Sequence, residues 1–396
     1  MIALTITISI IYFLLIFFFI IGFQRIKEFK PEEQIGESSF SIVIPFRNEA
    51  KNLPDLLRSI SHINYPKNKF EIILVNDDSD DDSVEIIEKF KTLYGGRKVK
   101  NSKPATPCLS VHKQSDGLKI SIFNNQEKSR SPKKDAIDLA IKKSKFDWII
   151  TTDADCIVPV NWLIVLSGFI HSQAPKMIVM PVSYEIHDGL LNGFQILELL
   201  SLQAATIGGF GLGQPFICNG ANLCYRKNCF VELDGFSGND NIASGDDVFM
   251  LEKMVRKYPT KVKYLKSKEV IVKTNTEKQF SDMVNQRIRW ATKTTSYKNY
   301  FGKFVGLTVL LMNFLILTLL LLTIFNVIAW PFLAVTLFSK ILIDFLLLVP
   351  ATLFFEQQYS LRNYLLSSFF YPFYNTFIGI LSLTKTYEWK GRKFSK

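Results

Sequence analysis

The chain has 396 residues, of which 48% are hydrophobic and 34 are phenylalanine, and its formal net charge is +11. Such an apolar and basic composition is typical of a membrane protein with a soluble part. The basic residues form no recognisable nucleic-acid-binding module, so we expect them to face anionic lipid head groups and expect no nucleic-acid partner. The five cysteines form no CxxC pair and the four histidines form no cluster, which excludes zinc-finger and disulfide-framework proteins.

The N-terminal residues predict a transmembrane helix. Residues 2–23 are uncharged and long enough to cross the ~30 Å hydrocarbon layer of a membrane. The charges of Arg25, Lys27 and Lys30 follow this stretch, whereas a cleavable signal peptide carries them in front, so we expect the helix to be retained. The positive-inside rule then predicts that the following domain is cytoplasmic.

The middle of the chain alternates between short β-branched runs and amphipathic stretches, which is typical of an α/β domain with a mainly parallel sheet. The predicted strands cover residues 40–46, 70–77, 118–125, 147–152 and 176–185. The predicted helices cover residues 52–60, 83–93, 133–144 and 161–170. The basic stretch 95–117 interrupts this pattern and is predicted to be a surface insertion.

Apolar stretches return after the α/β domain, at residues 305–330, 332–355 and 364–381. Lys340 and Asp344 lie four residues apart in the second stretch, where we favour a structural ion pair over a polar path. Three crossings would place the C-terminus outside, whereas the basic tail favours the inside. We therefore expect the third stretch to lie along the membrane interface or to re-enter it.

Polar and charged side chains follow three of the predicted strands. Ligands of open α/β sheets bind outside the carboxyl ends of the strands, so these residues are predicted to meet at one edge. Carboxylates that are crowded together repel each other, which indicates a bound cation. The Asp-x-Asp pair in TTDADC suits Mg²⁺ or Mn²⁺ held together with substrate phosphates. The residues at the three strand ends are Arg47, Glu49, Asn76, Asp77, Asp78, Asp153 and Asp155.

A series of short motifs in chain order resembles those of the membrane-bound glycosyltransferases of family 2, relatives of cellulose, chitin and hyaluronan synthases and of ceramide glucosyltransferase. The resemblance covers residues 40–295 and implies a GT-A fold, with a mixed, mainly parallel sheet flanked by helices and transmembrane helices at both ends. The motifs in this sequence are IVIPFRNEA, VNDDSDD, PKKDAID, TTDADC, SGDDVFM and QRIRW.

The resemblance implies that the first two motifs form the nucleotide pocket. Pro45 and Glu49 match the opening strand and turn of the family, and this strand end is expected to form a wall of the pocket. Asp77 matches an aspartate in the region that contacts the nucleotide base. Asn76 and Asp78 stand where the family has an aspartate and a glycine, which leaves the details of base recognition open.

The same resemblance implies the diphosphate and metal contacts. Lys133 matches a phosphate or nucleotide contact, with its neighbour Lys134 as the alternative. Asp153 is expected near the ribose and the metal, and Asp155 is expected to bind the metal, Mg²⁺ or Mn²⁺.

On the acceptor side, the resemblance implies that Asp247 is the general base and that its neighbour Asp246 belongs to the same motif. Gln286, Arg289 and Trp290 match the Q-x-x-R-W motif, which is expected to contact the diphosphate or the acceptor. The glycine-rich stretch 208–213 matches no phosphate-binding motif, and we interpret it as a flexible turn near the acceptor entrance.

Pattern and resemblance together predict a multi-pass integral protein of the inner or plasma membrane with a cytoplasmic catalytic domain. Its predicted activity is metal-dependent, inverting transfer of a hexose from a nucleotide sugar, expected to be a UDP-sugar, to a membrane lipid or lipid-linked acceptor. A processive polysaccharide synthase is the alternative, and an oligomer could supply the channel that it needs. Its predicted parts are an N-terminal transmembrane helix (1–24), a GT-A domain (38–285), an amphipathic interfacial helix (286–304), C-terminal transmembrane or interfacial helices (305–384) and a basic tail (385–396).

Overall fold

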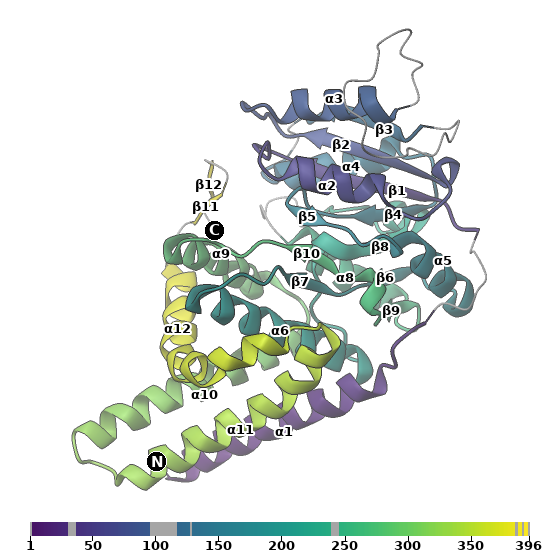
Figure 1. Ribbon diagram of the computed structural model, residues 1–396. Helices are drawn as coiled ribbons and strands as arrows, with labels where there is room; N and C mark the ends of the chain where they lie inside the picture. The colour runs from purple at the N-terminus through teal and green to yellow at the C-terminus, as the bar shows by residue number, and fades with distance from the viewer. Residues whose placement is uncertain are drawn as a thin grey trace.

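The computed structural model describes residues 2–30, 37–95, 117–126, 129–238, 245–384, 387–389 and 392–394. In these residues an α/β domain stands on a bundle of long apolar helices (Figure 1). The predicted surface insertion lies almost entirely outside the described residues.

The α/β domain is built on a seven-stranded sheet in the described residues, with the strand order β3-β2-β1-β4-β8-β6-β9. Strand β1 pairs in parallel with β2 and β4, and β2 pairs in parallel with β3. Strand β8 is antiparallel to both of its neighbours, which confirms the predicted mixed, mainly parallel sheet. The strands are β1 (Phe40–Phe46), β2 (Phe70–Asn76), β3 (Lys119–Asn124), β4 (Trp148–Thr151), β6 (Met177–Val179), β8 (Leu223–Arg226) and β9 (Val262–Tyr264).

The prediction of a single strand over residues 176–185 is wrong, because the chain changes sheets at Pro181. Proline has no N–H group to continue a ladder, and here the Asn222 side chain donates to the Pro181 carbonyl (2.7 Å). Strand β6 before the break belongs to the large sheet, and β7 after it belongs to a smaller one. The smaller sheet contains β5 (Cys156–Ile157), β7 (Val182–Tyr184) and β10 (Val272–Thr274).

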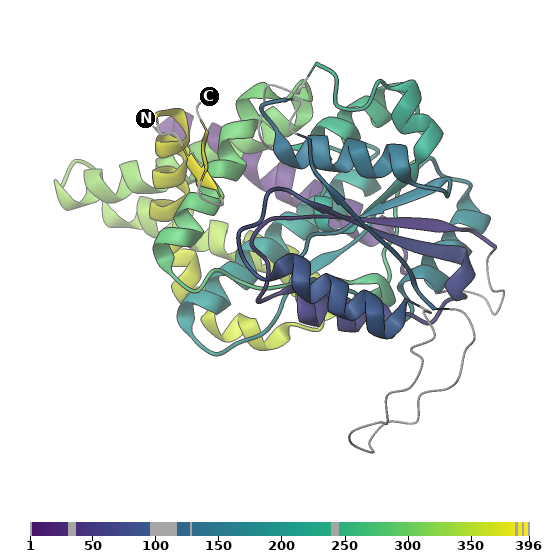
Figure 2. The same ribbon diagram turned by 90° about the horizontal axis from the view of Figure 1, so that it is seen from above.

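Helices cover both faces of the large sheet, as the view from above shows (Figure 2). Side chains alternate along a strand, so Ile42 and Ile44 of β1 share one core cluster with α2 and α5, whereas Val43 shares another with α4. The second cluster continues without interruption into the long apolar helices, which fixes the sheet on them. The helices of the domain are α2 (Leu53–Ser61), α3 (Ser83–Tyr94), α4 (Pro132–Lys143), α5 (Trp162–Gln173), α7 (Lys227–Glu232) and α8 (Asp246–Lys257).

Four helices of the described residues are long and apolar enough to cross a membrane. Helices α1, α10 and α11 lie close to three of the predicted apolar segments, whereas α6 was not predicted as a helix. The Lys340–Asp344 pair of α11 forms at 2.7 Å, and Asp344 also accepts a hydrogen bond from Tyr12 of α1 (2.6 Å), so the pair ties two helices together. The four helices are α1 (Ile2–Arg25), α6 (Leu190–Gly211), α10 (Tyr300–Ile324) and α11 (Trp330–Phe354).

The expectation of a flexible turn at residues 208–213 is wrong, because α6 continues through Gly211. The glycines allow α6 to cross α1 at backbone contact. A Cβ atom on Gly211 would lie 1.9 Å from the Gly22 carbonyl oxygen, and one on Gly208 would lie 2.7 Å from the Phe19 carbonyl oxygen. Small residues at such a crossing are a known packing device of membrane helices.

The prediction of one interfacial helix over residues 286–304 is also wrong. Helix α9 (Phe280–Thr292) carries the QRIRW motif and ends in a short 3-10 turn, and α10 begins separately at Tyr300. The Asn299 side chain caps α10 by accepting a hydrogen bond from the Gly302 N–H (2.9 Å). Helix α12 (Tyr364–Thr384) packs against α9 and α10, and a two-stranded C-terminal ribbon follows it, formed by β11 (Tyr387–Trp389) and β12 (Arg392–Phe394).

Candidate active site

Three elements bring four aspartates and a lysine together at the carboxyl edge of the sheet. Asp153 and Asp155 follow β4, Asp246 and Asp247 begin α8, and Lys133 lies in the first turn of α4. The Lys133 Nζ atom is 2.7 Å from Asp153 Oδ1 and 3.8 Å from Asp246 Oδ2. The lysine therefore joins the two predicted aspartate motifs.

The charges of this cluster are not balanced. Burial raises the pKa of Asp155 to about 6, and the neighbouring charges of Asp153 and Glu49 contribute to the shift. Burial alone would lower the pKa of Lys133, but Asp153 and Asp246 raise it above its ordinary value. Lys133 therefore stabilises the ionised forms of Asp153 and Asp246, whereas Asp155 is buried next to the negative charges of Asp153 and Glu49.

The Asp247 carboxylate is held in one orientation by backbone groups. Its Oδ2 atom accepts from the Gly220 N–H (3.2 Å), and its Oδ1 atom accepts from the Val248 N–H (2.8 Å). The Lys293 Nζ atom lies 3.9 Å from Oδ1. Lys293 follows the QRIRW motif and was not predicted as a site residue, because no pattern in the sequence links it to α8.

Helix α9 presents Gln286, Arg289 and Trp290 to the same region. Arg287, between them, is buried and forms hydrogen bonds of 2.8 and 3.0 Å with the Glu198 carboxylate of α6. Its guanidinium group also lies 4.5 Å from the centre of the Trp290 ring. Arg287 therefore fixes α9 on α6.

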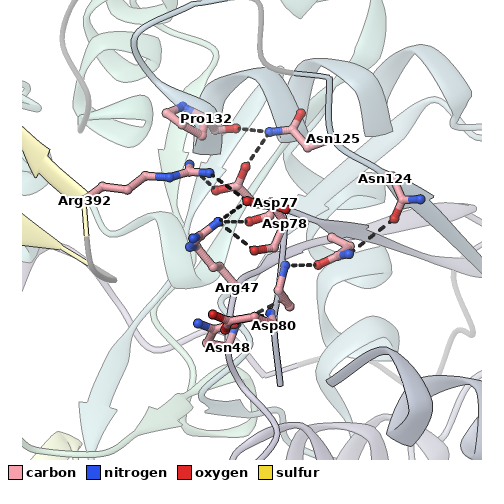
Figure 3. A network of polar contacts seen from close by, with 11 residues as sticks. Arg47, Asn48, Asp77, Asp78, Asp80, Asn124, Asn125, Pro132 and Arg392 are labelled. Carbon is pink, nitrogen blue, oxygen red and sulfur yellow. Dashed lines mark hydrogen bonds and ion pairs between the residues drawn. The ribbon is translucent and has the colours of Figure 1, made fainter. Parts of the chain in front are cut away.

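Asp77, the predicted base contact, lies at a second part of the site, where β1 and β2 end. The Asp77 N–H donates to the Phe46 carbonyl (2.8 Å), which joins the two strand ends. Its carboxylate accepts from the Asn125 amide (2.8 Å) and from the Arg392 guanidinium (3.0 Å), as Figure 3 shows. Pro45 follows the last β1–β4 pair, so its missing N–H group does not interrupt that ladder. No pattern in the sequence indicates the contacts that Asn125 and Arg392 make with Asp77.

The backbone explains the family's glycine at position 78. Asp78 has φ +59° and Asn48 has φ +53°, a left-handed conformation that glycine adopts without strain. Arg47 holds the turn, since it donates to the carbonyls of Asp77 and Asp78 (both 2.7 Å) and lies 3.3 Å from the Asp78 carboxylate (Figure 3). Asp78 in place of the family's glycine thus adopts the same left-handed turn and adds a carboxylate to it.

A cavity of about 830 Å³ connects the aspartate cluster with the apolar helices. Leu307 and Leu310 of α10 and Ile378 and Leu383 of α12 line its apolar part. Its polar part is lined by predicted site residues: Lys133, Asp153, Asp155, Asp246, Asp247, Gln286, Arg289 and Trp290.

Not all predicted residues reach this cavity. Pro45, Glu49 and Asp77 are not among the described residues that line it, so the predicted site has two adjoining parts. Lys134 is buried, with its ammonium group 5.0 Å from the centre of the Phe249 ring, which leaves Lys133 as the lysine of the cavity.

Comparisons with known proteins give a consistent result. The model of glycosyl transferase family 2 matches residues 41–230, and that of glycosyl transferase family group 2 matches residues 148–380. The chain is 28% identical over 123 residues to the glycosyltransferase AglE of Haloferax volcanii, a match that covers 31% of this chain and 32% of AglE. It is 34% identical over 119 residues to the undecaprenyl-phosphate 4-deoxy-4-formamido-L-arabinose transferase of Pseudomonas savastanoi, covering 29% of this chain and 27% of that enzyme.

A longer match is with the poly-beta-1,6-N-acetyl-D-glucosamine synthase of Staphylococcus aureus, 23% identical over 268 residues, covering 66% of this chain and 56% of the synthase. The match thus spans less than two thirds of the length of each of these three relatives. Among solved structures, the mannosyltransferase PcManGT from Pyrobaculum calidifontis, in complex with GDP-Man and Mn²⁺, has the same fold, with a TM-score of 0.53 at 15% identity over 93% of this chain and 98% of that one. Because the family group 2 match covers more than half of the chain, this protein belongs to the family 2 glycosyltransferases.

Proposed function

We propose that this chain transfers a hexose from a UDP-sugar to a membrane lipid or lipid-linked acceptor, with inversion at the anomeric carbon. The observation that carries the proposal is a continuous cavity with aspartates at one end and the apolar walls of α10 and α12 at the other. A lipid chain would lie between these helices while its head group meets the donor sugar.

The aspartate cluster suits a divalent cation. Asp153 and Asp155 offer oxygen ligands. Burial, together with the neighbouring charges of Asp153 and Glu49, raises the pKa of Asp155, and a bound cation would favour its ionised form. Mg²⁺ or Mn²⁺ bound there would neutralise the charge on the leaving diphosphate. Lys133 and Arg289, which line the same cavity, would bind the remaining diphosphate oxygens.

In this proposal, Asp247 accepts the proton of the acceptor hydroxyl as that oxygen attacks the anomeric carbon from the face opposite the diphosphate. The two backbone N–H groups on its carboxylate keep it oriented for this step. Because a single displacement inverts configuration, an α-linked donor gives a β-linked product. Asp77 would contact the base, and the turn that contains Pro45 and Glu49 would form a wall of the nucleotide pocket.

The S. aureus synthase, which covers most of this chain, favours a second candidate, processive polymer synthesis. The two candidates differ in their product. Membranes that carry the wild-type or Asp247→Asn protein would be incubated with a panel of radiolabelled nucleotide sugars. Organic-extractable lipid would then be separated from high-molecular-weight polymer. We expect Asp247-dependent label in the lipid fraction, whereas label confined to polymer would favour the synthase.

We also propose a multi-pass arrangement with a cytoplasmic catalytic domain. A cysteine introduced at Thr92, an exposed position on α3, should resist a membrane-impermeant thiol reagent in intact cells and react after permeabilisation. Labelling in intact cells would place the domain outside.

A further inference from the structure

The C-terminal ribbon, formed by β11 and β12, reaches the nucleotide end of the site. The Arg392 guanidinium lies 3.0 Å from Asp77 Oδ2 and 3.8 Å from Asp78 Oδ2. In Figure 3 Arg392 points from β12 toward the turn after β2, on the side opposite Asn124. No sequence motif links these residues, which are more than 300 positions apart.

This contact occupies the carboxylate proposed to recognise the nucleotide base. The Asn125 amide donates to Asp77 Oδ1, and Arg392 donates to Oδ2, so each oxygen already accepts a hydrogen bond from within the protein. With Arg392 in place, the Asp77 side chain is only 6% exposed. A base that presents an N–H group to this carboxylate therefore meets the guanidinium first.

We propose that the C-terminal ribbon is a latch on the nucleotide pocket, in which Arg392 takes the place of the base on Asp77 and donor nucleotide must displace it. The inference rests on the proposed function, because it takes Asp77 as the base contact. The latch covers the pocket until nucleotide competes for the same carboxylate.

The strength of the contact suits a reversible latch. The Arg392 side chain is 23% exposed although it lies 3.0 Å from Asp77, and the Asp78 carboxylate, 3.8 Å from Arg392, is 84% exposed. The ion pair between Arg287 and Glu198 differs from the Arg392–Asp77 contact, since it has two hydrogen bonds and is almost fully buried. Ion pairs near solvent are weak enough for a competing ligand to break, whereas doubly bonded buried pairs are not.

Two neighbouring features support the assignment. Asp78 stands where the family motif has glycine, so this chain has an additional carboxylate on the side from which Arg392 approaches. Strand β11 also contacts α9, the helix that carries QRIRW. Release of the ribbon would therefore remove contacts with α9, at the diphosphate side of the cavity, as well as the contact with Asp77 at the base end.

The first test measures the dissociation constants of UDP and GDP for the full-length protein in detergent. Arg392→Ala should bind the cognate nucleotide about 3- to 10-fold more tightly, since no charge-assisted contact has to be broken first. Asp78→Gly should give a smaller gain, and the two changes together should give no more than Arg392→Ala alone. Arg58→Ala is the control, because it removes an exposed arginine that is paired with Asp55 away from this contact.

A second readout follows the ribbon itself by hydrogen–deuterium exchange of residues 387–394. Nucleotide should increase exchange there in the wild type, and Arg392→Ala should have high exchange without nucleotide. Protection of the ribbon by nucleotide, or weaker nucleotide binding by Arg392→Ala, would show that Arg392 binds the donor and would overturn the latch. Unchanged affinity in Arg392→Ala, with normal wild-type binding, would overturn the latch alone. A wild type that binds neither nucleotide would overturn the proposed function as well.

Discussion

The two parts of the proposed donor site contain similar carboxylates, but they differ in how far neighbouring cations balance their charge. At the base end, Asp77 and Asp78 face two guanidinium groups, those of Arg47 and Arg392. At the catalytic end the aspartates outnumber the lysines near them, and the pKa of Asp155 rises to about 6 as a result of burial and neighbouring negative charge. The catalytic group consists of Asp153, Asp155, Asp246 and Asp247 with Lys133 and Lys293. Arginines of the protein itself pair with the carboxylates of the base end, whereas the aspartates of the catalytic end exceed the lysines paired with them.

The largest effect should come from the catalytic end. Asp247→Asn keeps the size of the side chain but cannot accept a proton, so we expect turnover to fall by about 10²- to 10⁴-fold while nucleotide binding persists. Initial rates and nucleotide affinity, measured on the same preparation, separate the two effects. Turnover equal to that of the wild type would remove Asp247 from the mechanism.

A smaller effect, on stability, is expected when an arginine that pairs with the carboxylates of the base end is removed. Arg47→Ala leaves the carbonyls of Asp77 and Asp78 without their guanidinium donor, which should cost about 1–3 kcal/mol of unfolding free energy. Thermal unfolding in detergent, with Arg58→Ala as the exposed-arginine control, measures this loss. Equal stability of the two variants would show that Arg47 does not hold the turn.

The pH dependence of stability sharpens the comparison at Asp155. Its folded-state pKa of about 6 lies above its ordinary value, so the metal-free protein should lose stability as the pH rises from about 4 through 6. In chelator, Asp155→Asn should match the wild type near pH 4 and exceed its stability by about 1–3 kcal/mol above pH 7. A difference that does not change with pH would contradict the charge imbalance.

The smallest effect is expected for Asp78→Gly. Glycine relieves the left-handed φ of +59°, which offsets the loss of an exposed ion pair with Arg47, so stability should change by less than about 1 kcal/mol. A loss as large as that of Arg47→Ala would show that the Asp78 carboxylate, and not the backbone, holds the turn.

Local patterns predicted most of the fold. Strands β1, β2 and β3 and helices α2 to α5 formed close to the predicted bounds, because periodicity and turn residues act over a few positions. The division of the strand predicted over residues 176–185 and the helix α6 were not predicted, because both depend on partners that are distant in the sequence. Pro181 divides the strand between two sheets, and the glycines of α6 resemble a loop until α1 packs against them.

The site shows the same limit. Motif residues such as Asp153, Asp247 and Trp290 line one cavity. The groups that position or balance them were not predictable, because each contacts its partner through the tertiary fold alone. Glu198 with Arg287 and Arg392 with Asp77 are separated by 89 and 315 positions, and no short pattern encodes such pairs.

The central claim, that the catalytic end of the site is built to hold a cation with the nucleotide, is tested most directly by Mn²⁺ binding. Electron paramagnetic resonance would measure free Mn²⁺ in the presence of UDP and purified wild-type, Asp155→Asn or Asp78→Gly protein. The account predicts stoichiometric Mn²⁺ uptake by the wild type and by Asp78→Gly, and loss of uptake in Asp155→Asn. Uptake by Asp155→Asn equal to that of the wild type would contradict it.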